Sequence, residues 1–152
     1  MSGVFCLLRF ENETDGILPA TEGGPPHTTI LYCKGQLAHR ELRSVISQFA
    51  LDWDYQDPLR VDSVSSNSFF KESSNSMRHD TFLCFDEESE NRLRRVGESI
   101  TTTFPSQKGR IDGQHYHITV ASDYSLSEHK ASQEHWQQKI PRNVKVLGFY
   151  CM

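Results

Sequence analysis

Residues 27–32 have the sequence His-Thr-Thr-Ile-Leu-Tyr, and residues 117–121 have the sequence His-Ile-Thr-Val-Ala. Both stretches open with the pattern His-x-Thr-aliphatic, and their histidines are 90 positions apart. Each is a short apolar run bounded by turn-like sequence, which predicts a β-strand. Because side chains alternate along a strand, His27 should share a face with Thr29, and His117 with Thr119. If the fold brings the two strands together, two imidazoles and two hydroxyls meet in one place.

The composition is that of one globular domain. The chain has 152 residues, 36% of them hydrophobic and 24% charged, which is enough for a core of its own. The net charge of -4 disfavours a long duplex or a tRNA-sized ligand, because such ligands normally meet a basic face. A small nucleotide bound by a few local cations remains possible. No apolar stretch approaches the length of a membrane span, so we expect no membrane association.

The four cysteines, Cys6, Cys33, Cys84 and Cys151, include no CxxC pair. We expect them to be small buried hydrophobic residues in a reducing compartment. No acidic or cysteine residue stands at metal-ligand spacing from either His-x-Thr motif, so we expect no metal site.

The rest of the chain alternates strand-like and helix-like segments. Periodicity predicts further strands at residues 4–10, 60–70, 81–85 and 144–150 and helices at residues 38–50, 86–103 and 128–140. Asp86 is a candidate N-cap for the second helix, and the capping box that starts at Ser125 precedes the third. The polar sequence of residues 105–113 predicts a loop before the second motif.

This order contains a weak internal repeat. The series strand, motif strand, helix, strand occurs at about residues 1–70 and again at about residues 79–152. We therefore expect a single domain, residues 1–152, made of two pseudo-repeats. Two copies related by a pseudo-dyad would place the motifs opposite each other.

A third match to the motif begins at His79, in the sequence His-Asp-Thr-Phe. His79 precedes the strand that is equivalent to residues 4–10, whereas His27 and His117 occupy equivalent places in the repeat. We therefore expect the pair His27 and His117 to be the functional one. The alternative is that Thr29 and Thr119 are ordinary β-branched strand residues. The remaining helical histidines, His39, His129 and His135, are expected at the surface.

The doubled motif resembles that of the 2H phosphoesterase superfamily, which is named for its paired His-x-Thr/Ser-x motifs. The resemblance spans nearly the whole chain, because motif separation, duplicated element order and length all match. It implies an α+β fold that is bilobal and duplicated about a pseudo-two-fold, with a concave, mostly antiparallel sheet and helices on the outside. It implies an active site in the central groove, with His27, Thr29, His117 and Thr119 as catalytic residues and no cofactor.

These residue types suit phosphodiester chemistry. The unperturbed pKa of histidine, about 6.5, lets one imidazole be neutral while another is protonated near neutrality. One can take a proton from an attacking hydroxyl or water, and the other can give one to the leaving oxygen. Threonine hydroxyls can donate to non-bridging phosphate oxygens. Which histidine is the base and which the acid is left open.

Four further residues are candidates for substrate binding. Tyr124, just after the second motif strand, could stack on a base. His115 should point to the same face as His117 and could contact a ligand at the pocket mouth, or it could simply meet water. Lys108 and Arg110 lie in the loop before the second motif and could meet a phosphate, or they could belong to a solvated loop.

The resemblance implies ribonucleotide phosphodiesters in which a 2'-oxygen takes part: 2',3'-cyclic phosphates, 2'-5' oligoadenylate or mixed-linkage cyclic dinucleotides. Some compact viral members degrade 2'-linked immune messengers. We expect a monomeric phosphodiesterase of the cytoplasm (the host cytoplasm if the chain is viral) that acts on a small nucleotide. The alternatives are RNA end processing or 2'-5' RNA ligation, as in the LigT branch, and a non-catalytic module that sequesters nucleotides.

Overall fold

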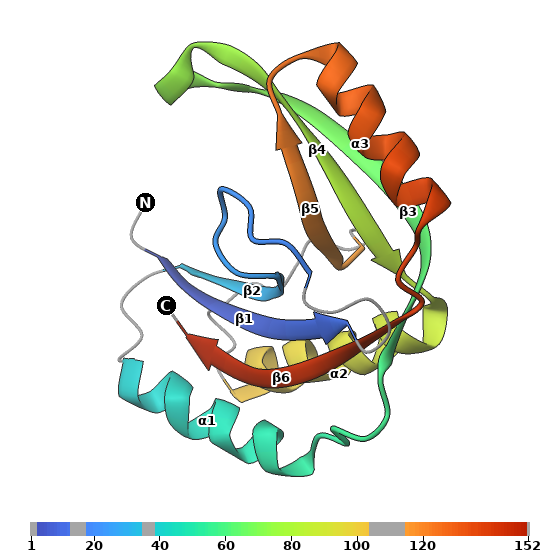
Figure 1. The fold of residues 1–152 in the computed structure, drawn as a ribbon. Helices are drawn as coiled ribbons and strands as arrows, with labels where there is room; N and C mark the ends of the chain where they lie inside the picture. Colours follow the sequence, from blue (N-terminus) through green and yellow to red (C-terminus); the bar gives the residue numbers. More distant parts are fainter. Residues whose placement is uncertain (1–2, 13–17, 35–38, 104–114, 152) are drawn as a thin grey trace.

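The computed structural model describes residues 3–12, 18–34, 39–103 and 115–151 (Figure 1). The elements run β1 (Gly3–Asn12), β2 (His27–Lys34), α1 (His39–Asp52), β3 (Leu59–Lys71), the 3-10 turn η1 (Glu72–Ser74), β4 (Ser76–Phe85), α2 (Glu87–Thr103), β5 (His117–Asp123), α3 (Leu126–Gln138) and β6 (Asn143–Cys151). The predicted mixed α+β class with an antiparallel sheet is confirmed. No helix in the described ranges is both long enough and apolar enough to cross a membrane.

The helix starts follow from local hydrogen bonds. Asp86 Oδ1 accepts from the Ser89 backbone N–H at 2.8 Å, and Ser125 Oγ accepts from the Glu128 N–H at 3.2 Å. Each side chain satisfies a backbone donor that the first turn of a helix leaves without a partner.

One predicted boundary is wrong. The strand expected at residues 81–85 begins at Ser76, because β3 and β4 form one long hairpin. The turn of this hairpin closes at Asn75, which adopts the left-handed conformation with φ of 50°.

The six strands form one sheet in the order β2-β1-β6-β3-β4-β5, and every neighbouring pair is antiparallel. The two motif strands, β2 and β5, are therefore the two edges. The sheet bends strongly between β6 and β3, so that Cα atoms of β2 and β5 lie within 8 Å of each other (Figure 1). Strands at opposite ends of the sheet order thus become neighbours in space.

Helices α1 and α3 cover different halves of the sheet, and α2 contacts a strand of each half. Helix α1 packs against β6, and α2 packs against β2 and β4, whereas α3 lies along β3, β4 and β5 (Figure 1). The aliphatic residues of the motif strands anchor them in the core: Ile30, Leu31, Ile118 and Val120 are each at most 5% exposed. Burial of each such side chain contributes about 1.5–3 kcal/mol relative to an exposed position, so the motif strands are well held.

The three histidines expected at the surface of helices have different positions in the structure. His135 is exposed, as predicted, and the side chain of His39 lies outside the described residues. His129 is buried at 8% exposure, so its predicted surface position is wrong. Its ring stacks on His79 of β4 at a centroid distance of 5.2 Å, because α3 lies directly against that face of the sheet.

Candidate active site

A pocket of about 480 Å³ lies on the face of the sheet away from α3. All four predicted catalytic residues line it: His27 and Thr29 from β2, and His117 and Thr119 from β5. The bend of the sheet brings them together across 90 residues of sequence. The other lining residues are Thr21, Gly23, Ser65, Asn67, Arg78, Asp80, Phe82, Cys84 and His115.

Strand alternation explains this set of residues. In β5 the buried residues Ile118 and Val120 alternate with the pocket-facing His117 and Thr119. In β4 every second residue from Arg78 to Cys84 faces the pocket. The pocket floor is therefore one face of β3, β4 and β5, and β2 closes it from the other edge.

Both motif histidines are oriented by the same type of hydrogen bond. Nδ1 of His27 donates to the carbonyl of Pro25 at 2.6 Å, and Nδ1 of His117 lies 3.4 Å from the carbonyl of His115. A carbonyl can only accept, so the ring proton belongs on Nδ1 in the neutral tautomer. Nε2 is then the nitrogen that can take up or deliver a proton. The two motifs thus present equivalent acid–base atoms.

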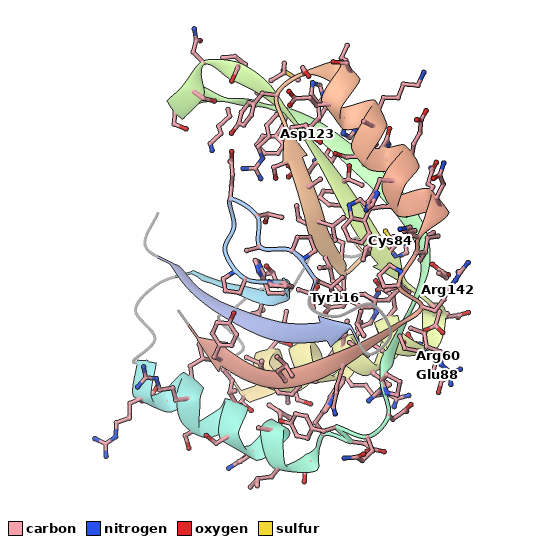
Figure 2. The ribbon with its side chains drawn as sticks, viewed as in Figure 1. Arg60, Cys84, Glu88, Tyr116, Asp123 and Arg142 are labelled. Atoms are coloured by element: carbon pink, nitrogen blue, oxygen red, sulfur yellow. The ribbon has the colours of Figure 1, made fainter. Side chains whose placement is uncertain are left out.

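Two residues of β4 lie next to His117 of β5. Phe82 stacks on it with a centroid distance of 4.1 Å and an interplanar angle of 34°. Cys84 (Figure 2) is paired with His117 across the strands and is a free, half-buried thiol. Burial raises the pKa of the Cys84 thiol, so it stays protonated near neutrality and is a poor nucleophile. The side chains of Cys6, Cys33 and Cys151 lie outside the described residues.

A tight hairpin forms the wall beside His27. Thr21 and Gly24 exchange two backbone hydrogen bonds of 3.0 and 2.9 Å, with Glu22 and Gly23 at the tip. Gly24 has φ of 101°, which an L side chain rarely adopts. A Cβ at Gly23 would lie 3.4 Å from Cε1 of His27, so glycine keeps this edge of the imidazole open.

An ion network joins the tip of this hairpin to the strands that line the pocket. Arg78 makes a two-pronged bond to the buried Asp80, with both distances 2.9 Å, and its Nη1 reaches Glu22 Oε2 at 3.0 Å. Lys71 Nζ also donates to Glu22 Oε2, at 2.8 Å, and Tyr124 Oη donates to Glu22 Oε1 at 2.6 Å. Arg78 is the one lysine or arginine among the described pocket residues, and two carboxylates already compensate its charge.

The predicted substrate-binding residues have different outcomes. His115 lines the pocket, and its Nδ1 is 3.9 Å from the buried carboxylate of Glu90. Tyr124 is 40% exposed and does not line the pocket; it belongs to the network around Glu22 instead. Lys108 and Arg110 lie outside the described residues.

The third motif match faces the other way. His79 does not line the pocket; it is buried against α3, and its Nδ1 lies 2.6 Å from Ser68 Oγ. The structure thus separates it from the pair formed by His27 and His117.

Sequence reasoning missed Arg78 and Asp80. The predicted strand began at Thr81, so their alternation with Phe82 was not considered. The spacing Arg-x-Asp-x-Phe is a usable signal once the hairpin is extended to Ser76, because it places all three side chains on one face.

Within the described ranges, no group of three or more histidine, cysteine or acidic side chains is arranged to hold a metal ion.

Comparison of the chain with protein-family models, with curated proteins and with solved structures found no match.

We expect the bridge at Glu22 to persist through neutral and mildly acidic pH. Hydrogen bonds from Lys71 and Tyr124 lower the pKa of Glu22 from 4.5 to about 2. Because the folded value lies below the ordinary one, the stabilisation is present above about pH 4.5 and is lost as the pH falls through about 2. An NMR titration of the Glu22 carboxyl carbon should show this low midpoint; a midpoint near 4.5 would mean that the bridge is absent in solution.

Proposed function

We propose that the chain is a 2H-type, metal-independent phosphodiesterase that cleaves small 2'-linked or 2',3'-cyclic ribonucleotides. One observation carries the proposal: His27, Thr29, His117 and Thr119 line a single pocket from opposite edges of the sheet. A shared pocket is not expected if the threonines were ordinary strand residues on unrelated edges.

The strand order supports a duplicated, two-lobed fold for this enzyme. The proposed repeats equate β1 with β4, β2 with β5, and β3 with β6. Exchanging these labels turns the order β2-β1-β6-β3-β4-β5 into its own reverse, as a pseudo-dyad between β6 and β3 requires. Under this symmetry the two motifs are equivalent, and the pocket between them is the central groove.

The proposed mechanism uses Nε2 of each motif histidine. One neutral imidazole takes a proton from an attacking ribose hydroxyl or water, and the other, protonated, delivers one to the leaving oxygen. The hydroxyls of Thr29 and Thr119 donate to non-bridging oxygens, where charge develops. The roles of His27 and His117 exchange with the direction of the reaction, and this suits their matching Nδ1 contacts.

Pocket size and charge support a small nucleotide. A volume of about 480 Å³ falls in the usual range for small-molecule sites, about 300–1,000 Å³. The net charge of -4 and the compensated Arg78 offer little attraction for a long polyanion. We favour 2'-5' oligoadenylate or a 2'-linked cyclic dinucleotide, such as an immune second messenger, met by a monomeric protein in the cytoplasm.

Replacement of either motif histidine should abolish cleavage without unfolding the protein. We expect His27→Ala and His117→Ala each to lower kcat by about 10²–10⁴, since each removes one proton-transfer step. Both rings are partly exposed, so the thermal melt should change little. His135→Ala, at an exposed histidine of α3, is the matched control. Full activity in either motif variant would overturn the proposal.

Loss of a threonine hydroxyl from either motif should lower kcat, but by less than loss of a motif histidine. We expect Thr29→Val and Thr119→Val to lower kcat by a factor on the order of 10²–10³, the usual range for one donor to a developing oxyanion. The neighbouring Thr28→Val is the control, because the fully buried Oγ1 of Thr28 has no hydrogen-bond partner among the described residues. Equal losses in Thr28→Val and Thr29→Val would point to packing instead of catalysis.

A substrate panel in EDTA separates the candidate functions. The panel contains 2'-5' oligoadenylate, 2',3'-cyclic mononucleotides, a mixed-linkage cyclic dinucleotide and all-3'-5' controls. We expect cleavage of at least one 2'-containing member, undiminished by EDTA, because paired histidines supply the proton transfer. A strict metal requirement would contradict the proposal. Intact nucleotide recovered after denaturation would identify a binding module, and joined RNA ends would identify a ligase.

A further inference from the structure

Glu22 lies at the tip of the hairpin that leads into the first motif. The hairpin is anchored at one end by Leu18, which is 3% exposed in the core, and at the other by the start of β2 at His27. Between these anchors, Thr21 and Gly23 line the pocket. The position of the tip therefore decides the shape of the pocket wall next to His27.

The carboxylate of Glu22 connects this wall to the opposite half of the sheet. Its three donors are Lys71 at the end of β3, Arg78 in β4 and Tyr124 just after β5, at distances of 2.6–3.0 Å. These residues lie 49, 56 and 102 positions away in sequence. In Figure 1 the hairpin lies between the layer of β1 and β2 and strand β5. All three contacts thus bridge the two sides of the pocket.

The bridge joins two parts of the molecule that no direct strand pairing connects in the described residues. Strands β2 and β5 are the two edges of the sheet, and no backbone ladder pairs them within the described residues. A small change in the bend between β6 and β3 would alter the separation of His27 from His117. The contacts of Glu22 directly join the two parts of the molecule whose separation such a change would alter.

Charge complementarity strengthens this bridge. Asp80, buried behind Arg78, holds the guanidinium in place by a two-pronged bond and leaves Nη1 to reach Glu22. Arg78 thereby becomes a pre-oriented donor, and less entropy is lost when Glu22 binds. Lys71 and Tyr124 are also within 3.3 Å of each other, so the three donors form one cluster.

We propose that Glu22 is a positioning residue, whose bridge to Lys71, Arg78 and Tyr124 fixes the hairpin beside the pocket and so keeps His27 opposite His117. The inference rests on the proposed phosphodiesterase function. Misplacement of a reacting group by about 1 Å can cost as much as 10²-fold in rate, so a bridge of this kind matters for catalysis even when it adds little to stability.

The test compares Glu22→Gln with Glu72→Gln. Both variants remove one negative charge, and Glu72 is an exposed residue of the nearby turn η1. In Glu22→Gln we expect amide exchange of Thr21 and Gly24 to rise roughly tenfold, because the hairpin opens more often. We expect kcat to fall roughly tenfold with KM nearly unchanged, and the shape of the pH–rate profile to persist, because both histidines remain. Glu72→Gln should change none of these quantities.

Lys71→Met provides a graded check, since it removes one of three donors and does not touch the pocket lining. It should raise the amide exchange of Thr21 and Gly24 and lower kcat, as Glu22→Gln does, but by smaller factors. Unchanged amide exchange in Glu22→Gln would overturn the bridge, and faster exchange with unchanged kcat would overturn its positioning role. A raised kcat or KM alone would identify Glu22 as a blocking or substrate-binding residue.

Amide exchange is measured without substrate, so this test does not depend on the proposed function. If the wild-type protein cleaves no member of the panel, the phosphodiesterase assignment fails. Amide exchange still tests the bridge, and the NMR signal of the His27 imidazole, compared between wild type and Glu22→Gln, still tests whether Glu22 fixes that ring. Unchanged exchange and an unchanged His27 line would reject the bridge by themselves.

Discussion

The pairing of β3 with β6 is the joint on which the arrangement of the molecule depends. It consists of Leu59 opposite Val144 and Arg60 opposite Asn143, after which β3 leaves β6 and follows β4. Leu59 and Val144 are fully buried. The backbone of Arg60 is also bound by Asp86 and Ser89, at the start of α2. This short, well-anchored joint sets the bend that brings the edge strands β2 and β5 together.

The pocket that results relies on orientation more than on charge. The ring of each motif histidine is oriented by the backbone carbonyl two residues earlier in the chain. The orienting group therefore belongs to the segment that leads directly into the motif strand. The only guanidinium among the described lining residues is held by Asp80 and Glu22. Under the proposed function, the threonine hydroxyls and imidazoles are the groups that meet the phosphate. This is consistent with proton transfer as the main catalytic contribution under the proposed mechanism.

Much of the site could be predicted because it follows from local patterns. Alternation along a strand placed His117 with Thr119 on one face, and the structure confirms that face against the buried Ile118 and Val120. Helix starts at Asp86 and Ser125 were predictable from their side-chain chemistry. The errors arose where distant elements meet: His129 is polar in sequence but is buried because α3 packs on β4. The contact of Tyr124 with Glu22, 102 positions away, was also not predicted.

Apart from the first half of β4, the sequence by itself determined the strands and helices, the paired His-x-Thr motifs and the face on which each motif residue lies. These depend on backbone periodicity and on contacts between residues close in the chain. Only the tertiary structure decided that the two motifs share one pocket, that His79 is excluded from it, and that Glu22 binds Lys71 across 49 residues of sequence. Those outcomes depend on the bend at the β3–β6 joint and on packing between elements far apart in sequence, and no local pattern encodes either.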